Sequence, residues 1–570
     1  MINYREKIAD ILAPHIEGLE RDEILPMIEV PADSSKGDYA FPCFKLAKIM
    51  RKAPPMIAKG IAEAIEGEEM FQKVESVNAY VNMFMSKAEF AGNVVKEVLE
   101  KDKDFGRSDM GAGRTVIVEY SSPNIAKPFH IGHIRSTVIG NSIYKIYDFL
   151  GYDTIRINHL GDYGTQFGKM ICAYRKWGNK EDVIREPIKS LLSYYTKFHE
   201  EAEKDPSLED EARAIFVRLE NGEPEEVELW QWFRDESLRE FNRVYDMLGI
   251  TFDSYNGESF YSDKMPAVVQ ELKDKGLLVE DNGAQIVKLD QFDLPPALIT
   301  KSDGSTLYIT RDIAAAIYRK NTYDFYKNIY VVASQQNLHF QQWKKVIGLM
   351  GYDWADDCVH VPFGLVSMEE GTMSTRQGRV IFLEDVLNRA VEQTRKIIME
   401  KNVNTENVDE TAREVGIGAV IFNELSNYRI KDYVFSWDKV LNFEGETGPY
   451  VQYTHARACS ILRNAGEAVM ASAKEGFDAS RITSDSAHAL IKLIYEMPEV
   501  IAEAGEKYEP SIVTRHIVDI AQAFNKFYHD EHILVDDETE KTAKVALVMA
   551  ARNVIRNGLD LLGMKAPEKM

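Results

Sequence analysis

Two histidines around a glycine, His130 and His133, stand where a β-branched segment gives way to a helical pattern, in the stretch VEYSSPNIAKPFHIGHIRSTVIGNS at 118–142. If that segment is a parallel strand, these side chains lie outside its carboxyl end, where ligands bind. The following helix offers free N–H groups and the positive end of its dipole to an anion. Gly132 lets a base ring or backbone approach closely, and imidazole N–H donors strengthen as charge develops on a phosphate. These residue types indicate a nucleoside triphosphate site.

The His-x-x-His spacing alone is common and has little specificity. A zinc hydrolase requires a glutamate after the first histidine and a distant third ligand, whereas Ile131 and Gly132 stand between these two. No Cys-x-x-Cys pair exists, so we expect no structural zinc and no bound metal site. The thiols are scattered, which fits a reducing compartment; they are Cys43, Cys172, Cys358 and Cys459.

The elements around the histidines predict a parallel sheet. RTVIVEY at 114–120 is typical of a buried strand, 134–150 of a helix that stops at Gly151, and DTIRIN of a second strand. A strand, a helix and a strand in this order form a βαβ unit. From about 168 to 300 the pattern is helical, acidic and aromatic, so we expect an insertion there, after which strands and helices alternate again.

The length of 570 residues and a hydrophobic fraction of 45% favour three or four domains. Residues 1–112 fit a small α+β domain, with helical segments on both sides of Pro54 and Pro55 and a strand-like segment VESVNAYVNMFMS. We expect the α/β domain at 113–385, with the insertion inside it, and an all-helical domain at 386–570.

The formal net charge is −23, so charge alone does not indicate a nucleic-acid-binding protein, although a basic patch can lie on an acidic chain. The N-terminal segment carries acidic residues and resembles neither a signal nor a transit peptide. No apolar run reaches the roughly 20 residues of a membrane span. We expect a cytoplasmic protein with no membrane contact.

The segment SSPNIAKPFHIGHIRSTVIGNS, together with INHLGDYGTQFG further along the chain, resembles class I aminoacyl-tRNA synthetases, and among them the arginyl enzymes. The class motif HIGH stands at His130–His133, and the HLGD segment at His159–Asp162 also matches, with Tyr163 where the family often has tryptophan. The resemblance implies a Rossmann-type catalytic domain with a helical insertion. It also implies a small α+β N-terminal domain that contacts the tRNA elbow and an all-α C-terminal anticodon-binding domain. The matching flanks are Ser121, Ser122, Pro123, Asn124, Ala126, Lys127 and Pro128.

The second class motif, KMSKS, stands here as TMSTRQG at 372–378, with threonines in place of both lysines. Arginyl enzymes commonly depart in this way, and the resemblance implies that Lys127 then stabilises the phosphates, an ammonium delivered from another loop. Arg376 is a second candidate. The catalytic residues implied are His130, His133 and Lys127. The ATP-binding set adds Gly132, Met373, Ser374, Thr375 and Arg376, with Mg²⁺ held by phosphates and water.

An arginine pocket needs carboxylates and flat hydrogen-bond acceptors around the guanidinium. Tyr308 and Asp312 are four residues apart and share a face if a helix starts there; a helix-start role for Asp312 and strand packing for Tyr308 are the alternatives. The resemblance implies Tyr308 and Asp312 at the guanidinium, Asn124 and the histidines near the α-carboxylate, and Glu119 or Ser121 near the α-amine. The complete implied set is Glu119, Ser121, Asn124, His133, Tyr308, Asp312 and Gln336.

Aromatic residues and an arginine share one predicted helix face near 450, where they could stack on splayed bases or belong to the core. The resemblance implies the first role, with anticodon contacts from Tyr450, Tyr453, Arg457, Tyr528 and Met570. In the N-terminal domain it implies tRNA contacts from Tyr80 and Asn82.

The implied activity is ligation of L-arginine to tRNA-Arg with ATP, by a monomer in which bound tRNA precedes adenylation. A cysteinyl or glutamyl enzyme of the same class is one alternative, and a cysteinyl enzyme would show zinc ligands. A non-catalytic paralogue would be expected to lack the histidines or the C-terminal helices, and a small nucleotidyltransferase would lack the latter.

Overall fold

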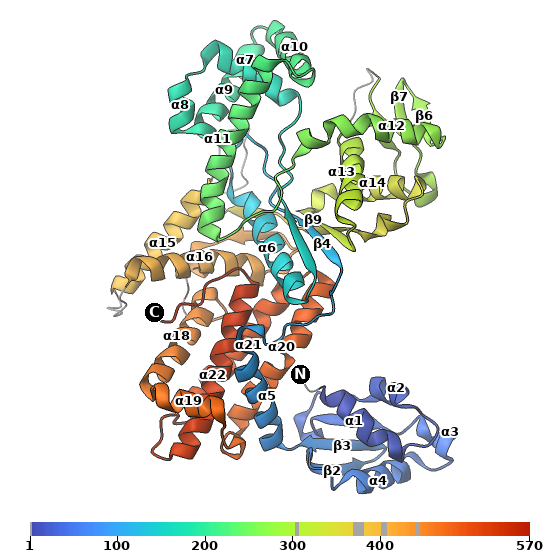
Figure 1. Ribbon diagram of the computed structural model, residues 1–570, viewed down its shortest axis with the longest axis vertical. Helices are drawn as coiled ribbons and strands as arrows, with labels where there is room; N and C mark the ends of the chain where they lie inside the picture. Colours follow the sequence, from blue (N-terminus) through green and yellow to red (C-terminus); the bar gives the residue numbers. More distant parts are fainter. Residues whose placement is uncertain (1–2, 303–306, 369–380, 401–406, 441, 443–444) are drawn as a thin grey trace.

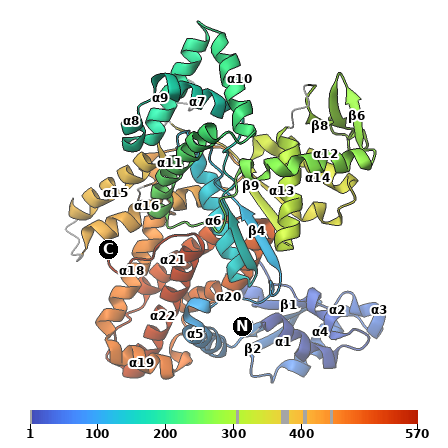
Figure 2. The same cartoon turned by 45° about the horizontal axis from the view of Figure 1, so that its top comes forward.

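The computed structural model describes residues 3–302, 307–368, 381–400, 407–440, 442 and 445–570. Figure 1 shows the N-terminal α+β domain beside the C-terminal helices at one end of the molecule, a parallel sheet in the middle and two inserted lobes at the other end. The turned view keeps this arrangement (Figure 2).

The N-terminal domain contains a three-stranded antiparallel sheet in the order β1-β3-β2. The segment expected to be one strand is a hairpin, because Asn78 takes a positive φ of 56° and Val77 pairs directly with Tyr80. Asparagine tolerates this left-handed conformation. Pro54 begins a helix, where a missing N–H is harmless. The elements are α1 (Tyr4–Leu12), α2 (Arg21–Ile24), β1 (Tyr39–Pro42), α3 (Leu46–Met50), α4 (Pro54–Ile65), β2 (Phe71–Val77) and β3 (Tyr80–Met85).

The central sheet is parallel, with the order β10-β9-β4-β5. The chain passes from β4 to β5 on one side and then crosses to β9 on the other, so the strand order reverses between β4 and β9. Open α/β sheets bind ligands outside the carboxyl ends of their strands at this switch point. The predicted βαβ unit is confirmed. The strands and the helix that follows the first are β4 (Thr115–Glu119), α6 (Ile134–Phe149), β5 (Asp153–Ile157), β9 (Lys327–Ala333) and β10 (Cys358–Phe363).

Helix α6 packs unusually closely on the end of β4. A Cβ atom added to Gly140 would lie 2.1 Å from Cβ of Tyr120 and 2.3 Å from its ring. Tyr120 is fully buried. No side chain fits at position 140, so glycine sets the distance between the helix and the strand.

The chain between β5 and β9 forms two lobes (Figure 1). The first is helical, as expected, and has its own core that includes Ile171, Phe198 and Phe233. The second contains an antiparallel sheet in the order β6-β7-β8, so the expectation of helices up to residue 300 is wrong there. Asn282 and Gly283 form its two-residue hairpin turn with positive φ, a turn that Asn-Gly favours. The elements are α7 (Thr165–Trp177), α8 (Lys180–Arg185), α9 (Pro187–Ala202), α10 (Ser207–Glu220), α11 (Pro224–Leu248), α12 (Met265–Asp274), β6 (Leu278–Asp281), β7 (Ala284–Val287) and β8 (Ala297–Thr300).

A separate two-stranded sheet connects the α/β domain to the helical region. A short strand there, β12 (Tyr433–Phe435), pairs in parallel with β11 (Val366–Met368), which follows β10. The expectation of an all-helical domain at 386–570 is therefore wrong at β12. The helices are α13 (Tyr308–Tyr323), α14 (Asn337–Leu349), α15 (Leu383–Glu400), α16 (Val408–Ser426), α17 (Trp437–Val440), α18 (Gly448–Ala465), α19 (Glu467–Glu475), α20 (Asp485–Lys507), α21 (Ser511–Asp530) and α22 (Glu538–Leu561).

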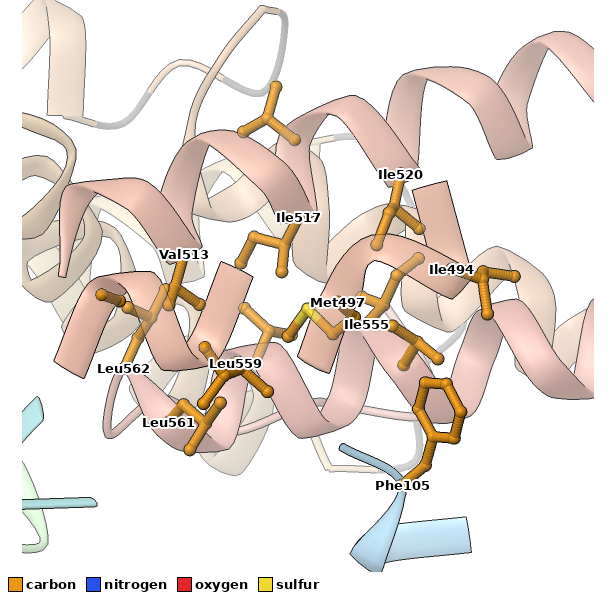
Figure 3. Close-up of a cluster of buried hydrophobic side chains, with 14 of the residues drawn as sticks. Phe105, Ile494, Met497, Val513, Ile517, Ile520, Ile555, Leu559, Leu561 and Leu562 are labelled. Carbon is orange, nitrogen blue, oxygen red and sulfur yellow. The ribbon is translucent and has the colours of Figure 1, made fainter. Parts of the chain in front are cut away.

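The core of the helical region lies between α20, α21 and α22. Figure 3 shows Met497, Ile517 and Ile555 pointing toward one another from these three helices. Phe105 joins the cluster from the N-terminal side, and α5 (Lys87–Lys101) packs against α20 and α22. Among the described residues, no helix is long and apolar enough to cross a membrane.

Substitution of Gly140 by alanine tests the close contact between α6 and Tyr120. The added methyl group forces the helix away from buried packing, and we expect a loss of about 1–3 kcal/mol or more in unfolding free energy. Scanning calorimetry should show a lower temperature for the transition of the central domain. Gly60→Ala in α4 is the matched control, since its Cβ meets nothing within 4 Å and alanine favours helix. Equal transition temperatures for Gly140→Ala and the unsubstituted protein would contradict this account.

Candidate active site

The loop that leaves β4 is held in a left-handed backbone conformation by buried hydrogen bonds. Ser121, Ser122 and Ala126 have φ values of 71°, 48° and 58°. The N–H of Ser121 donates to Oγ of Ser136 at 2.9 Å, and that hydroxyl donates to the carbonyl of Val331 at 2.8 Å. Such residues persist only where the surroundings enforce them, and they concentrate at functional sites. Ser136 thus joins the ends of β4 and β9 to the first turn of α6.

The two histidines form the turn before α6, and their backbone contacts fix their tautomers. The N–H of His130 donates to Nδ1 of His133 at 3.1 Å, and the N–H of Gly132 donates to Nδ1 of His130 at 3.0 Å. The ring centroids are 4.0 Å apart. Because both Nδ1 atoms accept these bonds, the ring proton of each neutral histidine lies on Nε2, which remains free to donate.

Burial keeps both histidines neutral. It lowers the pKa of His133 to about 3, with His130 as a second cause, and it also lowers the pKa of His130. The pair can therefore bind phosphate oxygens through N–H donors without carrying charge of its own near neutral pH.

Lys127 supplies the positive charge that the histidines lack. Its side chain is partly buried, and burial lowers its pKa, an effect that nearby Glu258 opposes. Within the described ranges, no hydrogen bond or ion pair holds its ammonium group. A partly buried ammonium without a partner is suited to bind an anion. Residues Met373, Ser374, Thr375 and Arg376 of the predicted ATP set lie outside the described residues.

The predicted guanidinium residues lie on α13, which begins at Tyr308 as the spacing requires. Asp312 pairs with Nε2 of His339, and Tyr308 is 63% exposed, so its ring is not packed on a strand. Farther along the helix, Arg319 is fully buried and its Nη1 lies 2.6 Å from Oε2 of Glu119. The carboxylate of Glu119 is therefore already paired.

Glu258 is a site residue that the sequence did not indicate. Its carboxylate lies 3.2 Å from Nη1 of Arg311, whose guanidinium stands over the rings of Tyr163 and Tyr308. Burial raises the pKa of Glu258 to about 7, with Arg311 opposing the shift and Asp312 adding to it. The carboxylate of Glu258 thus interacts electrostatically with both Lys127 and Asp312.

The other predicted pocket residues occupy different surroundings. Ser121 is buried, with its hydroxyl bonded to Thr137 and Tyr245 at 2.8 Å each. Asn124 is exposed and lies on Gly161, where an added Cβ would come within 2.2 Å of its side-chain oxygen. Gln336 is exposed just beyond the carboxyl end of β9. Ser121 therefore supports the loop, while Asn124 and Gln336 are exposed.

The missed residues leave a weak signal in the sequence. Arg319 follows Asp312 by seven residues, so both lie near one face of α13. His339 follows Gln336 by three residues at the start of α14. Glu258 begins a 3₁₀ helix (Glu258–Lys264) between the two inserted lobes, and no periodicity in the sequence marks it. Among the described residues, no group of three or more His, Cys, Asp or Glu side chains is placed to hold a metal ion.

The predicted anticodon face lies on α18 and α21. Arg457 stands over the rings of Tyr453 and Tyr528, at 5.0 and 5.5 Å, and both tyrosines are more than 40% exposed. Arg457 and the hydroxyl of Tyr450 both bond to Asn525. The arginine is thus held between two exposed rings, a surface suited to stacking on bases. Met570 is partly buried.

In the N-terminal domain, Tyr80 packs edge-on against Phe44 at 5.4 Å, and Phe44 is 55% exposed. Asn82 is 5% exposed within β3. Phe44, which is exposed, and Tyr80, which is partly buried, are therefore better placed than Asn82 for a macromolecular contact.

Three family models match the chain. They are described as the catalytic domain of class I tRNA synthetases (R) at residues 94–437, the DALR anticodon binding domain at 451–570 and the arginyl tRNA synthetase N terminal domain at 3–85.

Curated relatives match over the full length. Proteins named arginine–tRNA ligase from Halothermothrix orenii and Clostridioides difficile are each 59% identical, with 100% of both chains covered. The solved arginyl-tRNA synthetase of Thermus thermophilus shares the fold, with a TM-score of 0.81, 24% identity and 100% coverage of both chains. The catalytic-domain match alone spans more than half of the sequence. The chain belongs to the arginyl-tRNA synthetase family of class I.

Proposed function

We propose that this chain is an arginine–tRNA ligase, which activates L-arginine with ATP and transfers the arginyl group to the 3′-terminal ribose of tRNA-Arg. The observation that carries the proposal is the position of Glu258. Its carboxylate interacts electrostatically with Lys127 on the phosphate side and with Asp312 on the guanidinium side. One site can therefore receive a triphosphate and a cationic side chain together.

In the first step, a carboxylate oxygen of arginine bonds to the α-phosphorus of ATP and the bond to pyrophosphate breaks. The Nε2–H groups of His130 and His133 and the ammonium of Lys127 stabilise the charge that develops on the phosphates. Asp312, Glu258 and Tyr308 hold the guanidinium, and alignment supplies the remaining rate enhancement. Mg²⁺ enters with ATP as part of the substrate, bound by the phosphates and water.

In the second step, the 2′-hydroxyl of the terminal ribose attacks the carbonyl carbon of the adenylate, loses its proton, and AMP leaves. The tRNA contacts proposed for the anticodon are those of Tyr450, Tyr453, Arg457 and Tyr528, supported by the exposed rings around Arg457. The elbow contact is that of Phe44 and Tyr80. The domain limits 1–112, 113–385 and 386–570, the contacts of Asn82 and Met570, the monomeric state and the cytoplasmic location stay predictions.

Pyrophosphate exchange tests the proposed function. With each amino acid in turn, in the presence and absence of total tRNA, we expect exchange only with arginine and only when tRNA is present. Exchange with a different amino acid, or no exchange under any condition, would sink the proposal.

Lys127→Ala removes the ammonium group beside the phosphates. We expect kcat for arginine-dependent exchange to fall about 100- to 1000-fold, with KM for arginine changed little, because the lost interaction acts on developing charge. Lys127→Arg should restore part of the rate. Lys103→Ala, at an exposed position, is the control. If Lys127→Ala retains nearly full activity, phosphate stabilisation belongs to Arg376 instead.

The protonation of Glu258 predicts a pH dependence of arginine recognition. With a pKa of about 7, Glu258 is protonated below neutrality and cannot pair with a guanidinium, so binding improves as pH rises. At saturating ATP, KM for arginine should fall about tenfold from pH 6 to pH 8. Glu258→Gln should raise KM and remove this slope, whereas Glu280→Gln, at an exposed position on β6, should leave both unchanged. A slope that persists in Glu258→Gln assigns the titration to another group.

A further inference from the structure

A buried charged cluster lies directly behind the histidine turn. Arg135 is the second residue of α6 and follows His133 by two positions. Its side chain and that of Glu424 on α16 are both 0% exposed, and Nε of Arg135 lies 3.7 Å from Oε2 of Glu424. The hydroxyl of Tyr433, at the start of β12, bonds to the other oxygen of Glu424, and the guanidinium stands over its ring at 5.2 Å. We call Arg135, Glu424 and Tyr433 the Arg135 cluster.

The same guanidinium joins two backbone segments. Nη1 of Arg135 donates to the carbonyl of Gly364 at 3.0 Å and to that of Lys431 at 2.7 Å. Gly364 directly follows β10, and Lys431 precedes β12. One side chain on the helix that carries the histidines therefore holds the connection from β10 to β11.

The connection is enclosed from the other side as well. The N–H of Gly364 donates to the carbonyl of Arg429 at 2.8 Å, and the N–H of Leu365 donates to Oδ1 of Asp432 at 2.6 Å. A Cβ added to Gly364 would lie 2.6 Å from that same oxygen. Residues 364 and 365 therefore have one position available relative to α6.

Stability alone does not account for the cluster. A buried ion pair contributes little net stability unless all its polar atoms are satisfied. In the described part of the chain, Nε and Nη2 of Arg135 and Oε2 of Glu424 have no hydrogen-bond partner. Apolar residues of similar volume would fill this space without burying these unsatisfied polar atoms. What they could not supply is the pair of hydrogen bonds to the carbonyls of Gly364 and Lys431.

We propose that Arg135, which lies 3.7 Å from Glu424, is a positioning residue that fixes the β10–β11 connection relative to His130 and His133. The inference rests on the proposed function and deepens it. Strand β11 packs directly against the histidine turn at Ile131–His133, so the position of the connection bears on where the two histidine rings stand. The arginine pocket on α13 is attached elsewhere. Loss of the link therefore lowers the rate of adenylation and leaves arginine binding intact.

The cluster also places α16 in direct contact with the catalytic centre. Helix α16 packs against both α6 and α18, the helix that carries Tyr453 and Arg457 (Figure 1). Nε2 of Gln452 on α18 donates to the carbonyl of Glu414 on α16 at 3.2 Å. The proposed anticodon helix and the histidine turn are thus separated by one helix.

The test separates positioning from stability with a double variant. Arg135→Met combined with Glu424→Leu removes both buried charges, and the unfolding temperature should stay close to that of the unsubstituted protein. In tRNA-dependent exchange with arginine and ATP, kcat should fall about 10- to 100-fold because the connection is displaced. KM for arginine should change less than about twofold, since the contacts of arginine with the pocket on α13 are retained. Lys145→Ala is the control, as Lys145 lies on the same helix and pairs with Asp560 at 3.1 Å; it should leave kcat unchanged.

Recovery of both unfolding temperature and kcat in the double variant would overturn the inference, because a merely structural role predicts that the two recover together. If the double variant does not fold, Arg135→Lys replaces it. The lysine keeps the charge but not the fork that reaches two carbonyls, so a folded protein with lowered kcat supports positioning and an unchanged kcat overturns it. An inactive unsubstituted protein overturns the proposed function itself, which distinguishes the two failures.

Discussion

The hydroxyl of Ser136 makes the hydrogen bonds on which the catalytic centre depends. It accepts from the N–H of Ser121 and donates to the carbonyl of Val331, so it joins the exits of β4 and β9 to α6. The switch point of an α/β sheet is useful only if the two diverging strand ends keep a fixed separation. Here that separation, the left-handed loop and the histidine turn are set together by one buried side chain. Gly140 then sets how closely the helix approaches.

A strongly acidic chain must recognise a cation and a polyanion in neighbouring places. In the structure, each carboxylate of the candidate pocket is paired with a basic side chain of its own. Glu119 pairs with Arg319, Asp312 with His339 and Glu258 with Arg311. Pairing holds the carboxylates in place and limits the repulsion among them. Lys127 is left without such a partner among the described residues, which leaves its charge available for the proposed contact with phosphates.

The sequence predicted the strands and helices whose formation depends on residues close together in the chain. The strand before Ser121 and the helix after His133 both follow from periodicity and turn residues, whereas the start of α13 at Tyr308 was left open between helix and strand. The sheet β6-β7-β8 was not predicted although Asn282-Gly283 marks its hairpin. Its strands are only four residues long, and they lie in a segment whose composition is mainly acidic and aromatic. Pairings between distant residues, such as Glu119 with Arg319 and Arg135 with Glu424, depend on chain crossings that no local pattern contains. Glu258 and the pairing of β11 with β12 were missed for the same reason.

The Arg135 cluster has a consequence for how the chain can be divided. The carbonyl of Lys431, which accepts from Arg135, lies 296 residues further along the chain. During synthesis, the nucleotide-binding fold emerges long before its buried guanidinium can find an acceptor or a counter-charge. A fragment that ends before α16 would carry an uncompensated charge directly behind its histidines. The helical region is therefore part of the folding unit around the histidine turn, because separating the two would leave Arg135 without Glu424 and without the carbonyl of Lys431.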